Sequence, residues 1–299
     1  MQDSTDPARD PAGGRRAMMA GLAAIALWGL LATLSVAAGP IPPFQLVAMT
    51  FAVGAFLGIV RARRRGMGWA ALARWPIAVW MLGIGGLFGY HALYFSALQL
   101  APPAEANLIN YLWPLLIVLL AAPLAGERLG WTHLAGAALG LAGVALLAFG
   151  RGVAFAGHYA LGYALALGCA FAWSLYSVLS RRFGQTPTDA IAAFCAASAL
   201  LSLVCHLLFE TTVWPSDAKA WLAVLALGVG PTGGAFYLWD HAVKHGDIRA
   251  LGAASYAAPI LSTALLIACG LAPPTGSLLL AALLVAGGAT LASRDLWAR

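Results

Sequence analysis

Ten apolar segments, each about as long as a membrane-spanning helix, follow one another along almost the whole chain. About 20 apolar residues in a helix cross the hydrocarbon core of a bilayer. Glycine, proline and arginine punctuate the short intervals between the segments. The pattern therefore predicts an all-α membrane protein with ten transmembrane helices, at residues 17–38, 43–60, 76–98, 104–124, 131–149, 160–180, 189–209, 219–242, 250–270 and 276–293.

The composition excludes the other common classes of protein. Of the 299 residues, 62% are hydrophobic and 9% are charged, whereas about 25% of the residues of a soluble domain are charged. The formal charge of +6 comes from short basic runs between apolar segments, so no nucleic-acid partner is expected. The four cysteines lie inside apolar segments without metal-ligand spacing, and we expect neither a metal nor a cofactor.

The lysines and arginines are distributed unequally between the two sides of the predicted membrane. All but two of the 17 fall on one side, and Arg151 and Lys219 lie on the other. Positively charged loops stay in the cytoplasm. We therefore expect a multi-pass protein of a bacterial-type inner (plasma) membrane with both termini in the cytoplasm. Residues 1–16 are polar and contain two prolines, and they are predicted to be a disordered cytoplasmic tail.

The two halves of the chain align at a constant offset of 145 residues. The clearest match pairs Tyr111-x-x-Pro114 with Tyr256-x-x-Pro259. The offset divides the chain into a first repeat at residues 17–150 and a second at 157–295, each with five predicted spans. Since five is odd, the second repeat enters the membrane from the opposite side. The sequence thus predicts two inverted repeats around a central cavity, as in many secondary transporters.

Polar and aromatic side chains recur within the spans at helical spacing. Amides and hydroxyls facing lipid would lack hydrogen-bond partners, so we expect these side chains to line the cavity. The alternative is that the polar groups join helices and the aromatic rings pack or lie at the membrane interfaces. Pro114 and Pro259 lie near mid-span and are predicted hinges. The predicted substrate-binding residues are His91, Tyr94, Asn110, Tyr111, Trp113, Trp173, Tyr176, Trp239, Ser255 and Tyr256.

Acidic residues are scarce inside the spans. Glu105 and Asp240 lie near span ends, which leaves His91 as the titratable candidate near the midplane. Carriers coupled to ions usually keep an ionisable group near the midplane. The sequence therefore favours transport that is uncoupled or only weakly linked to protons.

Several short motifs, taken in their order along the chain, resemble the drug/metabolite transporter superfamily in its ten-helix form with two EamA-type repeats. They are Ala26-Leu27-Trp28-Gly29, Ala172-Trp173-Ser174, the stretch from Tyr94 to Leu115, and Gly126-Glu127-Arg128. The Tyr-Leu-Trp-Pro run at 111–114 and His91 are most similar to the aromatic amino acid exporters of that superfamily. The resemblance implies a basket of helices with a cavity that opens alternately to each side and exports aromatic and other neutral amino acids. A monomer is expected.

The second half departs from the motif pattern, because Leu271-Ala272 stands where the first half has Gly126-Glu127. For Glu127 we therefore expect no more than a loop or helix-capping role. An exporter of other small metabolites or drugs is the alternative function within the superfamily, and a channel-like protein is the alternative from another class. The spans contain no HExxH, paired aspartates or GxSxG, which argues against an intramembrane enzyme.

Overall fold

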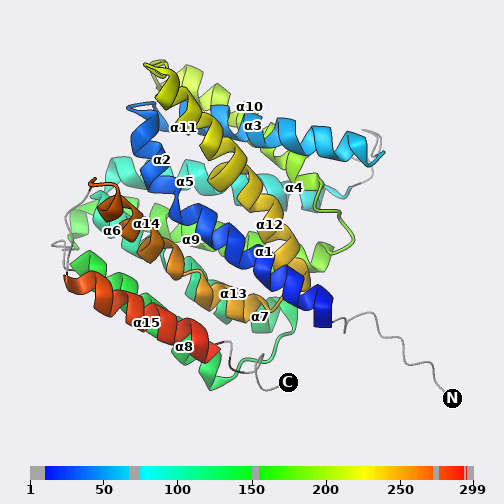
Figure 1. The fold of residues 1–299 in the computed structure, drawn as a ribbon, viewed down its shortest axis with the longest axis vertical. Coiled ribbons are helices and arrows are strands. Elements are labelled where there is room, and N and C mark those ends of the chain that lie inside the picture. The colour runs from blue at the N-terminus through cyan, green and yellow to red at the C-terminus, as the bar shows by residue number, and fades with distance from the viewer. Residues whose placement is uncertain (1–10, 67–74, 150–154, 272–275, 293, 295–299) are drawn as a thin grey trace.

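The computed structural model describes residues 11–66, 75–149, 155–271, 276–292 and 294, and this part of the chain contains helices and no strands (Figure 1). The α-helices are α1 Pro11–Gly29, α2 Leu31–Ala38, α3 Pro43–Arg64, α4 Ile77–Ile84, α5 Tyr90–Leu100, α6 Pro103–Asn110, α7 Trp113–Ala125, α8 Trp131–Phe149, α9 Ala160–Leu179, α10 Ala190–Phe209, α11 Ala218–Val229, α12 Ala235–His245, α13 Ile248–Ala254, α14 Ala257–Ala268 and α15 Gly276–Ala292. Short 3₁₀ turns, η4 Gly157–Tyr159 and η5 Ser180–Phe183, flank α9, and two π-helical turns, η3 Gly85–Gly89 and η6 Gly230–Gly234, interrupt longer helices.

Several consecutive helices join into longer apolar stretches. Counting these joined stretches together with the single helices α3 and α10, eight stretches in the described part are long and apolar enough to cross a membrane, and Trp131–Leu146 and Leu279–Ala292 are shorter apolar helices. The protein is therefore a helical, multi-pass membrane protein with eight to ten candidate spans.

The predicted N-terminal tail is too long. Helix α1 begins at Pro11, so residues 11–16 are helical rather than part of a disordered tail. Proline is well tolerated in the first turn of a helix, where its missing N–H would have no partner. Residues 1–10 lie outside the described part of the chain.

Helix interruptions recur at, or within one residue of, the offset of 145 residues. The π-helical turns η3 and η6 start at Gly85 and Gly230, and each is followed directly by an α-helix, α5 or α12. Helices α6 and α7 are separated at Tyr111–Leu112, and helices α13 and α14 are separated at Ser255–Tyr256. Pro114 follows the first of these two separations, and Pro259 follows the second, each within three residues. Proline cannot donate the hydrogen bond that a continuous helix would need. The sequence thus interrupts both halves at matching places.

The two halves pack against each other through matching helices. Helix α3 packs most extensively on α10, along the upper edge of Figure 1, and α8 packs on α15 along the lower edge. Between these edges, α1 contacts α12 and α14, while α9 contacts α5 and α7. At the repeat offset, α1 corresponds to α9, α5 to α12 and α7 to α14. The contacts of α1 with α12 and α14 are therefore equivalent to those of α9 with α5 and α7, and exchanging the halves preserves the contact pattern.

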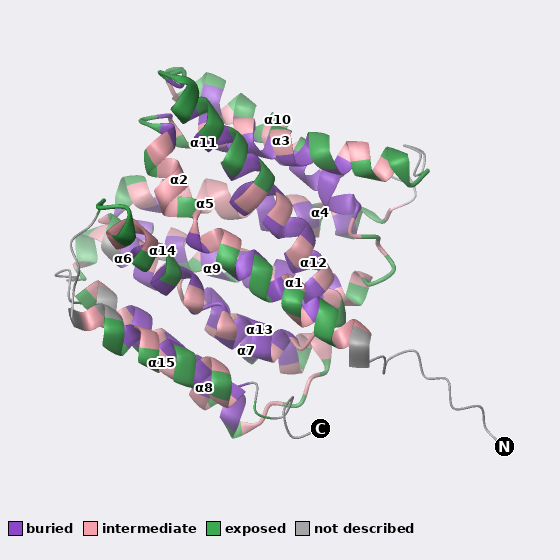
Figure 2. Cartoon of the chain, viewed as in Figure 1, coloured by how far each residue is buried: buried purple, intermediate pink, exposed green. Residues whose placement is uncertain are grey.

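Figure 2 shows buried and exposed residues alternating along the helices. The exposed residues include many large apolar side chains, while the buried ones are small, aliphatic, aromatic and hydrogen-bonded residues. Phe209 and Leu279 are 76% and 70% exposed, as expected for side chains that face lipid. Inside, Ser174 is fully buried and donates to the backbone carbonyls of Trp113 and Ala170. The buried hydroxyl is thereby satisfied and ties α9 to α7.

Candidate functional site

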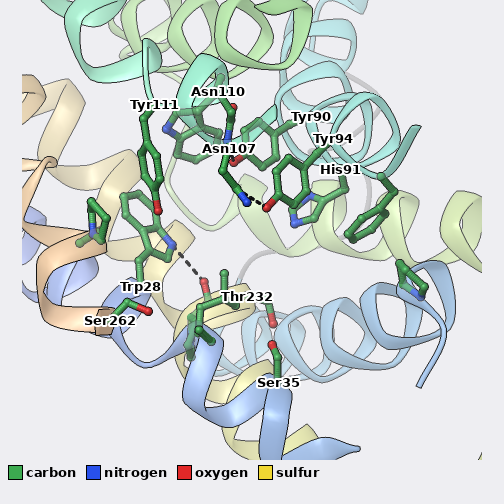
Figure 3. Close-up of a pocket in the computed structure, with 18 of the residues that line it drawn as sticks. Trp28, Ser35, Tyr90, His91, Tyr94, Asn107, Asn110, Tyr111, Thr232 and Ser262 are labelled. Atoms are coloured by element: carbon green, nitrogen blue, oxygen red, sulfur yellow. Dashed lines mark hydrogen bonds between the residues drawn. The ribbon is translucent and has the colours of Figure 1, made fainter. Parts of the chain in front are cut away.

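A cavity of about 610 Å³ lies between helices of both halves (Figure 3). Its described lining contains aromatic, aliphatic and neutral polar side chains, and no aspartate, glutamate, lysine or arginine. It extends from Trp28, Trp113 and Trp173 to the exposed Pro43, where the chain enters α3. Its volume falls in the range of small-molecule sites. The polar lining residues are Ser35, Thr50, Tyr90, His91, Tyr94, Asn107, Asn110, Tyr111, Thr232, Ser262 and Thr263.

Helices α5 and α6 supply a hydrogen-bonded wall of this cavity. Tyr94 donates its hydroxyl to Asn107 Oδ1 at 2.6 Å, and Asn110 Nδ2 donates to the Tyr90 hydroxyl at 3.0 Å. The rings of Tyr90 and Tyr94 stack with centroids 6.1 Å apart. Asn110 Oδ1 is buried and has no hydrogen bond within the described residues. A free acceptor beside a cavity suits a ligand that carries an N–H or O–H group.

His91 lies beside this wall with a defined proton position. Its Nδ1 is 2.7 Å from the Leu87 carbonyl oxygen. A carbonyl only accepts, so Nδ1 of the neutral ring carries the proton and Nε2 is left as an acceptor. The ring also contacts Phe51 edge-on at 5.2 Å, which fixes its orientation in the lining.

Four tryptophans pack together at the floor of the cavity, and we call them the tryptophan cluster: Trp28, Trp113, Trp173 and Trp239. The first three line the cavity, and Trp239 is buried against them. All six of their ring centroid separations lie between 5.1 and 6.3 Å. Most of these contacts are edge-to-face or tilted, which are favourable arrangements for aromatic rings. Trp28 Nε1 donates to the Pro231 carbonyl, where η6 interrupts the helix, and Trp239 Nε1 donates to Ser177 Oγ. The cluster thus closes the cavity with large rings whose N–H groups are bonded at these two positions.

The structure brings six of the ten residues predicted to bind substrate into the lining: His91, Tyr94, Asn110, Tyr111, Trp113 and Trp173. The other four, Tyr176, Trp239, Ser255 and Tyr256, are buried outside the described lining. The residue 145 positions before each of these four in the sequence does line the cavity. These counterparts are Leu31, Tyr94, Asn110 and Tyr111. Of the two predicted hinges, Pro259 lines the cavity and Pro114 is buried behind it.

Sequence reasoning left several lining residues out of the predicted site. Trp28 matches Trp173 at the repeat offset, and that match could have identified it. Tyr90 precedes Tyr94 by four residues and therefore lies on the same face of α5. Asn107 lies one turn before Tyr111, and Phe236 is the repeat counterpart of His91.

The opposite end of the bundle is held by ion pairs between the halves, and we call this group the closed-end ion network: Glu127, Arg181, Asp247 and Arg249. Glu127 Oε1 is 3.0 Å from Arg181 Nη2, and Glu127 Oε2 is 3.8 Å from Arg249 Nη1. Arg181 also donates to the carbonyls of Val243 and Gly246. The expectation that Glu127 has only a loop or capping role is therefore wrong. Its partners are distant in sequence, so no local motif reveals them.

Asp247 holds Arg249 in place within this network. It precedes α13 and accepts hydrogen bonds from the backbone N–H groups of Arg249 and Ala250. Its Oδ2 is 2.8 Å from Arg249 Nη2. Burial alone would raise the pKa of this carboxyl, but the hydrogen bonds and the charge of Arg249 outweigh burial and lower it. Asp247 therefore stays ionised at neutral pH and orients Arg249 toward Glu127.

Together, the fold and the site define a helical membrane protein with a solute-sized cavity whose described lining contains no acidic residue, lysine or arginine. Residues 15–149 and 160–294 each match the EamA-like transporter family. The chain belongs to this family.

Known relatives cover nearly the full length of the chain. It is 54% identical over 279 residues to the aromatic amino acid exporter YddG of Ancylobacter novellus, an alignment that covers 93% of this chain and 96% of the relative. It is 27% identical over 304 residues to the protein of the same name from Escherichia coli (strain K12), with coverage of 93% and 96%. A solved crystal structure with 54% sequence identity superposes with a TM-score of 0.87, covering 93% of this chain and 98% of that one.

Proposed function

We propose that this protein exports aromatic and other neutral amino acids across the inner membrane. The observation that carries the proposal is the central cavity, which lies between the halves, has no charged side chain in its described lining and ends on the tryptophan cluster. Aromatic rings favour flat apolar side chains by stacking and ammonium groups by cation–π attraction. The names of the relatives support the same substrate class. We propose a carrier rather than an enzyme, acting as a monomer.

We further propose that the chain forms ten transmembrane helices in two inverted repeats, at residues 17–150 and 157–295, with both termini in the cytoplasm. The matched interruptions at η3 and η6 and the exchangeable helix contacts support two equivalent halves. The unequal distribution of lysine and arginine supports the orientation. In this orientation the cavity opens away from the cytoplasm, and the closed-end ion network faces the cytoplasm.

Alternating access then follows from the symmetry of the repeats. When the cytoplasmic end opens, residues of the second half take the places that their counterparts hold in the first. Tyr176, Trp239, Ser255 and Tyr256 would then line the cytoplasm-facing cavity, as Leu31, Tyr94, Asn110 and Tyr111 line the present one. Pro114 and Pro259 would act as hinges, because each follows a helix break and lacks a backbone donor.

The test is transport by the purified protein in liposomes, measured as counterflow of tryptophan, phenylalanine, methionine and threonine. We expect saturable flux that does not require a proton gradient, since the described lining contains no carboxylate. Cationic dyes and nucleotide sugars should compete poorly. Amino acid flux no greater than in empty liposomes would refute the proposal, and non-saturable flux would favour a channel. Flux that strictly depends on a pH gradient would refute the uncoupled mechanism.

A pair of tyrosine variants tests the site. Tyr94→Phe removes the hydroxyl that holds Asn107 Oδ1 and should weaken the apparent affinity about fivefold, as expected for one lost hydrogen bond of about 1 kcal/mol. Tyr163→Phe is the control, because it removes a hydroxyl outside the described lining. Equal transport by the two variants would show that the Tyr94 hydroxyl does not contribute to substrate binding and that Tyr94 only packs.

A further inference from the structure

A second cavity, of about 440 Å³, lies where α3 ends and α10 begins. Its lining includes Arg61 and Arg65 from the end of α3, Asp189 from the turn before α10, and Tyr237 and His241 from α12. It lies at the same end of the bundle as the closed-end ion network, and the transport cavity shares none of its residues. The proposed export function therefore makes no use of it.

A buried carboxylate lies within ion-pair distance of two arginines at this cavity. Asp189 has a side chain only 6% exposed, and its Oδ1 lies 3.1 Å from Arg61 Nε, while its Oδ2 lies 3.6 Å from Arg65 Nη1. The arginine side chains are 45% and 60% exposed, so both guanidinium groups remain accessible. Arg61 meets the carboxylate through Nε. Two cations over one anion leave a net positive site with donors available for an oxyanion.

The cavity lies at the boundary of the membrane. Helix α3 is an apolar span whose last turn contains Arg61, Arg63 and Arg64. One turn before Arg61 on the same helix, Leu57 and Phe56 are 41% and 65% exposed. Leu57 is four residues before Arg61 and therefore shares its helix face, and Phe56 is the neighbour of Leu57 in the sequence. A cationic cavity is thus adjacent to an apolar surface that is available to acyl chains.

We propose that this cavity binds the headgroup of an anionic phospholipid, with the phosphate on Arg61 and Arg65 and the acyl chains along Phe56 and Leu57. Basic pockets between transmembrane helices suit such headgroups. Membrane orientation alone explains positive charge near this boundary. It does not explain a cavity in which a buried carboxylate forms ion pairs with two guanidinium groups. The bound lipid would join α3 to α10, the two helices whose ends form the site.

The experiment is native mass spectrometry of the purified full chain, titrated with phosphatidylglycerol or phosphatidylcholine. We expect phosphatidylglycerol to bind more tightly. Arg65→Gln should weaken its binding about fivefold, because an arginine near an anionic membrane contributes about 1 kcal/mol. Arg64→Gln is the matched control, since it removes the same charge from the neighbouring residue, which is outside the described lining. Arg65 is well exposed, so its variant should fold.

Three outcomes would overturn the proposal. Equal binding of the two lipids would exclude selection of an anionic headgroup. Equal losses in Arg65→Gln and Arg64→Gln would show general charge attraction rather than a site. Binding of sn-glycerol 3-phosphate as tight as that of the lipid would make the ligand a free phosphate ester. The double variant Arg61→Gln/Asp189→Asn keeps the net charge but removes the built pair, and it should also weaken binding of phosphatidylglycerol.

Discussion

Replacing Glu127 with glutamine should loosen the closed end of the bundle without unfolding it. Glutamine keeps the size and the acceptor oxygen of the side chain but removes the charge that meets Arg181 and Arg249. Both arginines retain other partners, since Arg181 donates to two backbone carbonyls and Arg249 pairs with Asp247. The substitution therefore leaves no buried cation isolated, and it acts on the contact between the halves.

The size of the effect follows from the geometry. The close contact, at 3.0 Å between Glu127 Oε1 and Arg181 Nη2, changes from an ion pair to a hydrogen bond from the arginine to a neutral amide oxygen, which costs about 1 kcal/mol. The contact at 3.8 Å with Arg249 is longer, and the side chains involved are 13% to 24% exposed, so it adds less than about 1 kcal/mol. A total of about 1–2 kcal/mol raises the equilibrium constant for opening this end about 5- to 30-fold.

Amide hydrogen exchange measures this opening directly, because exchange of a protected amide requires local opening. Exchange should accelerate by that factor in residues 121–130 and 244–252 and stay unchanged in residues 94–102, at the other end of the bundle. Arg182→Gln is the matched control, because Arg182 donates to the Leu124 carbonyl and is exposed. Unchanged exchange near Glu127 would refute the role of the network, and so would equal acceleration in the control or at both ends.

Two further predictions concern pH and packing. Asp247→Asn should lower the unfolding temperature at pH 7, because it removes the ion pair with Arg249. The pKa of Asp247 is lowered in the folded protein, so its charge stabilises the fold above the usual carboxyl pKa of 3.8. The difference in unfolding temperature from the wild type should therefore vanish as the pH falls through the lowered pKa. Thermal unfolding at pH 7 and pH 3 checks this: the difference should be smaller at pH 3, and a difference as large at pH 3 as at pH 7 would contradict it. Gly58→Ala should cost about 1–3 kcal/mol of stability, because the added methyl group would overlap the Tyr237 hydroxyl. Gly85→Ala, with open space around the new methyl group, is its control, and equal unfolding temperatures for the two variants would refute the packing argument.

Much of the fold is present in local patterns of the sequence. Apolar segments of spanning length predict helices wherever they occur, because a backbone in lipid must satisfy its own hydrogen bonds. The sequence placed matching prolines, Pro114 and Pro259, within two predicted continuous spans, and the structure has a helix break shortly before each of them. The start of α1 was misplaced, because residues 11–16 carry charge and glycine yet continue an apolar helix. Composition alone does not reveal that continuation.

The candidate site shows what local sequence patterns do not predict. His91, Tyr94 and Asn110 could be placed on interior helix faces from spacing alone, but spacing does not say which interior faces meet water and which meet protein. Tyr94 lines the cavity while its repeat counterpart Trp239 is fully buried, although both occupy equivalent helical positions. A carrier alternates between two states, one open to each end. In a single structure, only the member of each repeat-related pair that lies toward the open end lines the cavity.

By itself, the sequence determined the membrane environment, the helical class and the division into two halves, because these depend on the hydropathy and spacing of neighbouring residues. Only the tertiary structure decided which side chains form the cavity, which tryptophans close it, and which ions hold the opposite end. The pairing of Glu127 with Arg181 joins residues 54 positions apart. Such contacts depend on how the two halves pack, and that packing is a property of the whole chain.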